Sequence, residues 1–122
     1  MSSDKNDDNT VISFLKNDVK KFVEERGWKR YHTPKNLIQA LQIEAAELSE
    51  LLLFKQMTRD DILHNEEMMN KISNEMADVL IYLISISNCL NIDLAQSFIK
   101  KMEMNKHKYS VQEFNNGMYY KK

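Results

Sequence analysis

Two pairs of acidic residues at helical spacing, Glu44-x-x-Glu47 and Glu75-x-x-Asp78, interrupt the two most apolar stretches of the chain. Residues three apart lie on one face of an α-helix, so each pair projects its carboxylates together. Carboxylates in a packing stripe lose hydration and repel one another unless a positive charge lies between them. If the two helices pack antiparallel the four acids converge, and this arrangement predicts a bound divalent cation.

The donor types narrow the choice of ion. A site built from oxygens alone suits Mg²⁺, with Mn²⁺ as a substitute. A di-iron carboxylate bundle needs Glu-x-x-His on two helices, and neither Glu44 nor Glu75 has His three residues on. Zinc is disfavoured because His and Cys at metal spacing are missing. The competing interpretation is an ordinary solvated acid pair, but both pairs lie inside apolar stripes, which favours the metal.

Composition predicts one helical domain. The chain has 122 residues, of which 43% are hydrophobic and 29% charged, and it contains only two Gly and one Pro. So little turn-forming material predicts an all-α fold, a four-helix bundle. The net charge of -1 argues against a surface for a nucleic acid polymer, because such surfaces carry a basic excess.

The same sequence predicts a cytoplasmic protein without a membrane span. The single cysteine, Cys89, cannot form an internal disulfide, and its apolar neighbours predict a packed helix end. The first nine residues carry no apolar secretory segment. The most apolar stretch, residues 79–86, is far shorter than the roughly 20 residues of a membrane span.

Apolar periodicity and capping residues predict where the helices lie. Thr10, Thr33 before Pro34, Thr58 and the run Asn91-Ile92-Asp93 are the expected caps. The expected helices cover about residues 11–26, 34 to 55 or 56, 66–90 and 94–108. We therefore expect a disordered polar tail over 1–9, a helical domain over 10–109 and a C-terminal tail over 110–122.

Cations and aromatic residues near the acid pairs suggest a phosphorylated ligand. The stripe of the last helix carries Lys101 and Asn105 where leucines are usual, although a lysine there can simply extend to solvent. Tyr82 lies one turn beyond Asp78, and several other rings lie at helix ends, where the ordinary interpretation is core packing. Beside a four-acid metal site, Lys101 becomes a reasonable ligand for a triphosphate.

Five segments in one order resemble a known family. They are Phe22-Val23-Glu24-Glu25-Arg26-Gly27-Trp28, Tyr31-His32-x-Pro34-x-Asn36-Leu37, Glu44-x-x-Glu47, Glu75-x-x-Asp78-Val79-Leu80-Ile81-Tyr82 and Lys101-Met102-x-x-Asn105-x-x-Lys108-Tyr109. Together they resemble the all-α nucleoside triphosphate pyrophosphohydrolases of the MazG-like superfamily, closest to the dCTP pyrophosphatase branch. The likeness covers about residues 11–109.

The resemblance implies a Mg²⁺-dependent enzyme that splits a deoxynucleoside triphosphate into monophosphate and pyrophosphate. It implies that Glu44, Glu47, Glu75 and Asp78 hold the metal. The chemistry of triphosphate hydrolysis also needs a group that orients the water, and the two catalytic candidates for this role are Glu44 and Glu47. The implied substrate-binding residues are Trp28, His32, Asn36, Phe54, Tyr82, Lys101, Asn105 and Tyr109. It also implies a homodimer or homotetramer.

Two alternatives stay open. The dCTP-type enzymes tend to carry Trp where this chain has Phe54, so dUTP or another deoxynucleotide competes with dCTP as the substrate. A non-catalytic helical interaction module, with methionines lining a partner groove, would explain the apolar stripes but not the acids inside them.

Overall fold

The computed structural model describes residues 4–122, and within them every regular element is helical, which confirms the predicted all-α class. The elements are α1 (Ile12–Glu25), a short 3-10 turn η1 (Lys29–Tyr31), α2 (Pro34–Glu50), α3 (Arg59–Leu63), α4 (Glu66–Leu90) and α5 (Leu94–Lys108). The chain forms two compact units, one ending at Asn91 and the other spanning Ile92–Lys122.

Most helices begin where the sequence predicts, because side chains satisfy the free amides of their first turns. The Thr33 hydroxyl accepts from the Asn36 amide at 3.2 Å, and Pro34 takes the first helical position. A reciprocal capping box between Thr58 and Asp61 begins α3. The Thr10 prediction is wrong, since Val11 occupies the cap of α1 without a side-chain hydrogen bond.

The second helix ends earlier than predicted, at Glu50 instead of residue 55 or 56. Residues 51–54 form a turn in which the Leu52 and Leu53 amides donate to carbonyls three residues back. Phe54 then adopts the left-handed region at φ 60°, which costs energy for a residue with a side chain. Residues 51–54 thus continue the apolar pattern of the helix in the sequence, but their backbone is not α-helical.

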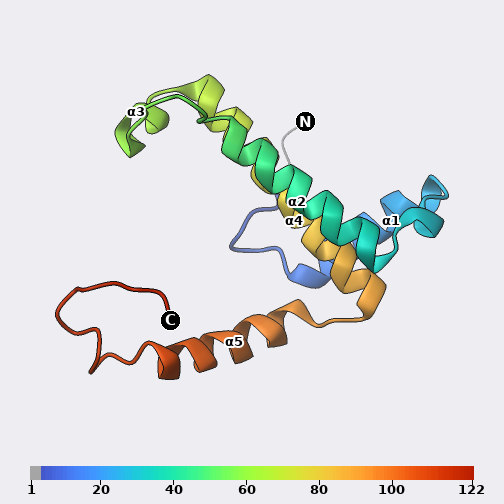
Figure 1. The fold of residues 1–122 in the computed structure, drawn as a ribbon. Helices are drawn as coiled ribbons and strands as arrows, with labels where there is room; N and C mark the ends of the chain where they lie inside the picture. Colours follow the sequence, from blue (N-terminus) through green and yellow to red (C-terminus); the bar gives the residue numbers. More distant parts are fainter. Residues whose placement is uncertain (1–3) are drawn as a thin grey trace. The chain divides into compact units, whose positions relative to one another are not determined.

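In the first unit α2 and α4 run antiparallel along one another, and α1 packs against α4 (Figure 1). Among the described residues the buried apolar side chains are Val23, Leu37, Met68 and Ile84, which come from these three helices. The Asn88 amide on α4 donates to the Lys16 carbonyl of α1 at 3.0 Å. This small core holds the stretches that carry the two acid pairs.

In the second unit, residues 110–122 fold back on the end of α5. The Phe114 ring lies between those of Tyr109 and Tyr120, with centroids 5.4 and 4.9 Å away. The Lys122 amide donates to the Tyr109 hydroxyl at 2.8 Å, and the Tyr120 hydroxyl donates to Glu113 at 2.6 Å. The tail is therefore joined to α5 by a ring cluster and polar contacts.

Three further predictions from the sequence can be compared with the structure. Cys89 is exposed, with its thiol 3.4 Å from the His32 carbonyl, so its predicted burial is wrong. Of the expected disordered tail, residues 1–3 lie outside the described residues, while the Asn6 amide donates to the Asn9 side chain at 2.8 Å in a turn. Over residues 4–122 no single helix is long and apolar enough to cross a membrane; α4 and α5 reach that length and composition only when taken together.

We predict that Asn88→Ala lowers the free energy of unfolding by about 1 kcal/mol, because the hydrogen bond that joins α4 to α1 is lost. Asn70→Ala is the matched control, since Asn70 is an exposed residue of the same helix and the change in helix propensity is the same. Urea denaturation of both variants measures the difference. Equal stability of the two variants would contradict the role of this bond.

Candidate metal centre and substrate cavities

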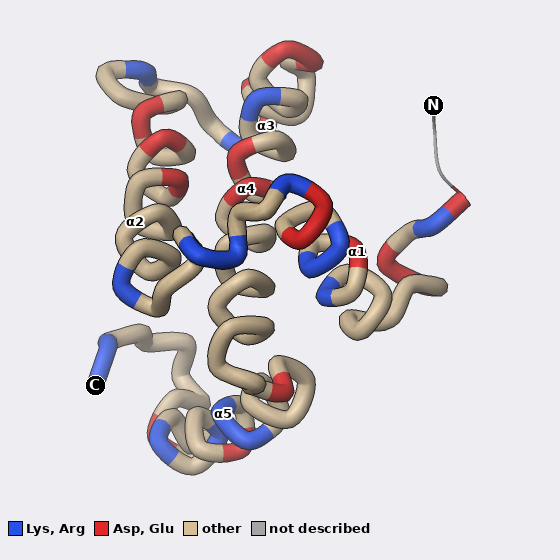
Figure 2. The backbone as a smooth tube through the Cα atoms, turned by 90° about the vertical axis from the view of Figure 1, so that its right-hand side faces the viewer, with Lys and Arg blue, Asp and Glu red and all other residues tan. Residues whose placement is uncertain are grey.

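Three of the four predicted acids meet between α2 and α4. Glu44, Glu75 and Asp78 each offer a carboxylate oxygen, and these oxygens lie within 4.8 Å of one another. All three residues are half-buried. The antiparallel pairing brings them together, because the C-terminal half of α2 lies beside the N-terminal half of α4, where Figure 2 draws acidic residues in red on both helices.

The buried oxygens of this cluster lack ordinary partners. Glu44 Oε2 and Glu75 Oε2 are buried and have no hydrogen-bond partner among the described residues. Buried polar atoms are nearly always paired, so two orphaned oxygens in one cluster call for a further group. A hard cation such as Mg²⁺ or Mn²⁺ fits an oxygen-only donor set, and the residues present therefore fit the predicted metal.

Electrostatics favours the same conclusion. Burial raises the pKa of Glu44 to about 7, and the hydrogen bond to Glu47 and the negative charges of Glu47, Asp78 and Glu75 act in the same direction. Burial also raises the pKa of Glu75, followed by the charges of Glu47 and Asp78. The charges acting on Glu44 are all negative, so the cluster takes up a proton near neutral pH unless a cation replaces it.

The fourth predicted acid, Glu47, lies at the edge of the cluster. Its side chain is exposed and is not among the three that converge, yet it contributes to the raised pKa of both Glu44 and Glu75. It is therefore close enough to act on the same bound group. Its solvent access distinguishes it from Glu44, which offers a buried oxygen.

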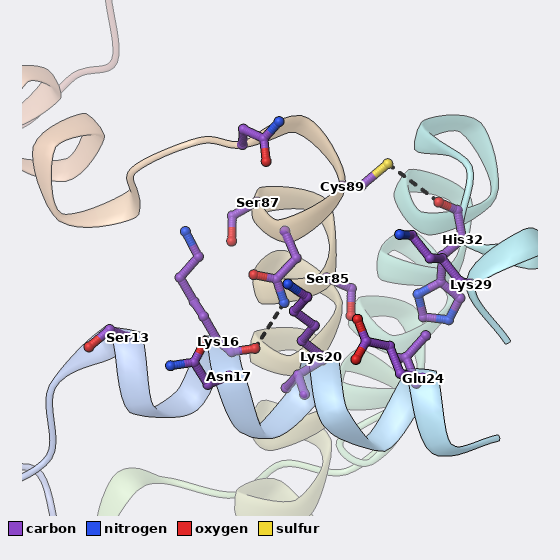
Figure 3. A pocket seen from close by; sticks show the side chains of 14 residues that line it. Ser13, Lys16, Asn17, Lys20, Glu24, Lys29, His32, Ser85, Ser87 and Cys89 are labelled. Atoms are coloured by element: carbon purple, nitrogen blue, oxygen red, sulfur yellow. Dashed lines mark hydrogen bonds between the residues drawn. The ribbon is translucent and has the colours of Figure 1, made fainter. Parts of the chain in front are cut away.

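A cavity of about 630 Å³ opens between α1, the connector to α2 and the C-terminal half of α4 (Figure 3). His32 lines it, and burial lowers the pKa of this histidine. The sequence did not predict the other polar lining residues as site residues, because they are scattered along the chain: Ser13, Lys16, Asn17, Lys20, Glu24, Lys29, Ser85, Ser87, Asn88 and Asn91. Ser85 is seven residues beyond Asp78, about 10 Å along the helix, so this cavity begins some distance from the acids.

The other predicted substrate residues of the first unit do not line that cavity. Trp28 packs edge-on against Phe22, with ring centroids 5.7 Å apart. Asn36 donates its side-chain amide to the Tyr31 carbonyl at 3.0 Å, which holds the connector. Tyr82 is half-buried one turn beyond Asp78, and Phe54 is 97% exposed in the turn after α2. The structure does not gather these four side chains into one pocket.

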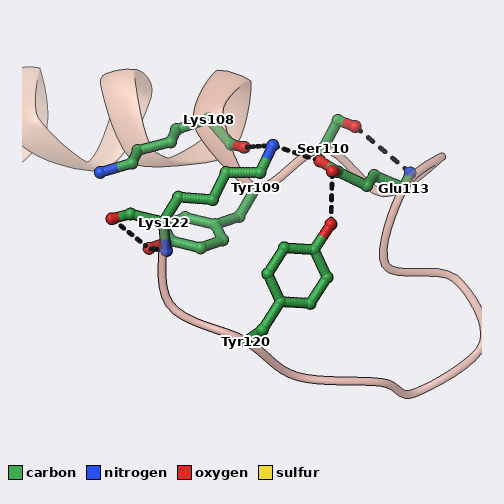
Figure 4. Close-up of polar contacts among 6 residues, drawn as sticks. All are labelled: Lys108, Tyr109, Ser110, Glu113, Tyr120 and Lys122. Carbon is green, nitrogen blue, oxygen red and sulfur yellow. Dashed lines mark hydrogen bonds and ion pairs between the residues drawn. The ribbon is translucent and has the colours of Figure 1, made fainter.

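In the second unit the structure does bring Lys101, Asn105 and Tyr109 together. They line a cavity of about 350 Å³, to which Lys108, Tyr119, Lys121 and Lys122 also contribute; Figure 4 shows Lys108, Tyr109 and Lys122 of this set. Sequence analysis missed the three tail residues because their positions depend on a fold-back without periodicity. The only available signal was the aromatic and basic run Tyr119-Tyr120-Lys121-Lys122.

Comparison with known proteins gives relatives of similar sequence. No protein-family model matches the chain. Over 91 residues it is 36% identical to a protein of Mus musculus named dCTP pyrophosphatase 1, an alignment that covers 74% of this chain and 54% of the relative. The Homo sapiens protein of the same name is 33% identical over 89 residues, 72% of this chain and 52% of the relative. The chain thus spans about half the length of these curated relatives.

A solved structure is similar along nearly its whole length. It is described as a pyrophosphatase from Archaeoglobus fulgidus and is 31% identical to this chain, with a TM-score of 0.74. The superposition covers 90% of this chain and 98% of the other.

We predict that the metal-free protein loses stability as the pH rises from about 5 to about 8. Glu44 has a folded-state pKa of about 7 against an ordinary 4.5, so in that interval the folded state binds more protons than the unfolded state. Mg²⁺ competes with those protons, so it should raise the melting temperature more at the higher pH. Thermal denaturation with Mg²⁺ and with EDTA measures both effects. In Glu44→Gln both should shrink, and an equal Mg²⁺ shift at the two pH values would contradict the site.

Proposed function

Because this chain belongs to the MazG-like superfamily of all-α nucleoside triphosphate pyrophosphohydrolases, we propose that it cleaves a deoxynucleoside triphosphate to the monophosphate and pyrophosphate. The observation that carries the proposal is the acid cluster between α2 and α4, with its two orphaned buried oxygens. We propose dCTP or a modified dCTP as the substrate and Mg²⁺ as the cofactor, with Mn²⁺ as a substitute. The names of the relatives support this substrate.

The acids divide between holding the metal and moving a proton. Glu44, Glu75 and Asp78 would hold the ion, which when bound neutralises phosphate charge and lowers the pKa of water. Glu47 is exposed beside them, so of the two candidates it is better placed to accept the proton of the attacking water. A phosphoanhydride bond then breaks, and pyrophosphate leaves with the electron pair of that bond.

Side chains outside the cluster supply groups for the rest of the nucleotide. Lys101, Asn105 and Tyr109 line one cavity and offer a charge and hydrogen-bond donors for phosphate or sugar. Phe54 offers an exposed ring held in a strained backbone conformation, which supports a role in stacking on a base. We further propose that Tyr82, Trp28, Asn36 and His32 lie around the nucleoside. The ring of Phe54 can stack on any base, so dUTP and other deoxynucleotides are the competing substrates.

We also propose that the chain acts as a homodimer or homotetramer. A chain of this size normally buries a larger core than the four apolar side chains buried among the described residues. On α4 the exposed residues Met76, Leu80 and Leu83 follow helical spacing and form an apolar stripe, the α4 stripe. A second copy of the chain, which presents the same stripe, is the partner that this face fits. The expected absence of nucleic acid and membrane partners and the expected cytoplasmic location stay predictions.

One rival function has an observation in its favour. Exposed methionines, including Met69 and Met76 on α4, are typical of adaptable surfaces that bind partner helices. A non-catalytic module of this kind would leave the two orphaned carboxylate oxygens without a purpose. An assay of hydrolysis separates the two functions directly.

We predict that the protein releases pyrophosphate from dCTP with Mg²⁺ and not with EDTA. The assay uses dCTP, 5-methyl-dCTP, dUTP, dTTP, dATP, dGTP and the ribonucleotides, each with either additive. Preference for cytosine nucleotides supports the proposed substrate, and preference for dUTP supports the competing one. No release from any nucleotide would sink the enzymatic proposal and leave the interaction module.

Substitutions of the acidic residues should have different effects, because the acids have different proposed roles. Glu75→Gln is expected to lose both turnover and the thermal stabilisation by Mg²⁺, because it removes a converging carboxylate. Glu47→Gln is expected to keep the Mg²⁺ stabilisation but lose turnover by roughly a hundredfold or more, the usual contribution of a general base. Glu66→Gln, an exposed residue in the first turn of α4, is the control and should retain both. Full turnover in Glu47→Gln would rule out its role as the base.

We predict that Leu83→Glu lowers the molar mass measured by light scattering toward that of one chain, because a charge in the α4 stripe opposes its burial. Val111→Glu is the control, since Val111 is also exposed, at 78%, but lies in the C-terminal tail. A wild-type mass of 14.4 kDa at all concentrations would contradict self-association.

A further inference from the structure

One face of α4 leads from the acid cluster to the cavity lined by His32. Residues three, four or seven apart share a face of a helix, so Glu75, Asp78, Tyr82 and Ser85 follow one another along α4. Glu75 and Asp78 belong to the acid cluster, and Ser85 lines the cavity. At the usual rise of an α-helix, Ser85 lies about 10 Å beyond Asp78. This separation is close to the span of a nucleoside with its first phosphate.

Ser85 is a buried polar residue that presents a fixed hydrogen-bond role to this cavity. The residue is 4% exposed, and its hydroxyl donates to the Ile81 carbonyl at 2.8 Å. A serine hydroxyl has one hydrogen and two lone pairs. Because the hydrogen is used within the helix, the oxygen of Ser85 can act toward a ligand only as an acceptor.

The polar residues that line the cavity beside α1 and the connector are less selective. Lys20, Glu24 and Lys29 are exposed, so water competes for their contacts with a ligand. Burial lowers the pKa of His32, which favours the neutral imidazole. A neutral imidazole has one donor and one acceptor nitrogen and can exchange them between tautomers. Of these residues and Ser85, only Ser85 combines burial with a single hydrogen-bond role.

We propose that the cavity lined by His32 receives the nucleobase, and that Ser85 selects cytosine by accepting a hydrogen bond from its 4-amino group. The inference rests on the proposed function, which supplies a nucleoside triphosphate held at the acid cluster. Cytosine carries a donor at position 4, whereas uracil and thymine carry a carbonyl oxygen there. That oxygen would face the acceptor of Ser85 and stay unpaired in a buried place, which opposes binding of the wrong base.

This position of the base also bears on Phe54. Helices α2 and α4 run antiparallel, and Phe54 follows the end of α2 that lies beside the first half of α4, whereas Ser85 lies near the end of α4 (Figure 1). The two residues are therefore on opposite sides of the acid cluster. A base at Ser85 is out of reach of Phe54 in the same chain, so stacking by Phe54 would come from the second copy in the proposed homodimer.

Binding of α,β-methylene dCTP and α,β-methylene dUTP to the full chain with Mg²⁺, measured by calorimetry, tests the assignment without turnover. The wild-type chain is expected to bind the dCTP analogue more tightly. Ser85→Ala removes the acceptor and should lower the ratio of the two affinities about tenfold, mainly through weaker binding of the dCTP analogue. Ser85→Thr keeps a hydroxyl that can bond to the Ile81 carbonyl, so it should retain the wild-type ratio.

Ser87→Ala is the matched control. Ser87 is also buried and donates its hydroxyl to a backbone carbonyl, that of Ile84, at 2.7 Å. It lies two residues beyond Ser85 and points to a different side of α4 (Figure 3). Its substitution should leave the ratio of affinities unchanged. Both analogues are measured on the same sample, so partial unfolding of a variant cancels in the ratio.

Three results would overturn the inference: equal binding of the two analogues by the wild-type chain, an unchanged ratio in Ser85→Ala, or an equal fall in Ser85→Ala and Ser87→Ala. Each of these, if accompanied by Mg²⁺-dependent binding and by hydrolysis of dCTP in a separate assay, rejects the role of Ser85 and leaves the proposed function standing. Binding of neither analogue, without hydrolysis, would reject the proposed function and the inference together.

Discussion

The repulsion among carboxylates held between α2 and α4 is the constraint on which the first unit depends. Glu44, Glu75 and Asp78 occupy positions in the packed faces of two antiparallel helices, where apolar side chains would be cheaper to bury. Burial, followed by the hydrogen bond to Glu47 and the neighbouring negative charges, raises the pKa of Glu44. A fold that retains such a cluster gives up stability in the empty state and regains it when a cation binds.

The surrounding structure keeps the acids in place although its core is small. Leu37 and Ile84 are almost completely buried on the two helices that carry the acids, and α1 is joined to α4 through Asn88. The same interface therefore determines both the packing and the geometry of the cluster. Loss of packing between α2 and α4 would separate the carboxylates, so the proposed metal binding would be coupled to folding.

The sequence predicted those features that depend on residues close together in the chain. The bounds of α4 and α5 follow from periodicity and from the caps at Asn65 and Asp93, and the spacing of the acids predicted the cluster. The end of α2 was missed because Leu51, Leu52 and Leu53 continue the apolar pattern, while the turn depends on a left-handed Phe54. The cavity lined by His32 joins residues distant in sequence, and the return of residues 119–122 to α5 has no periodic pattern, so neither could be predicted from spacing.

The nearly neutral net charge of the chain is the sum of local charges of opposite sign. Glu44, Glu75 and Asp78 converge between α2 and α4, whereas Lys101, Lys108, Lys121 and Lys122 line one cavity of the second unit, so the balance of -1 conceals two opposite local fields. Each field is unfavourable alone, since like charges repel within it. A bound cation would relieve the first, and a bound anion would relieve the second.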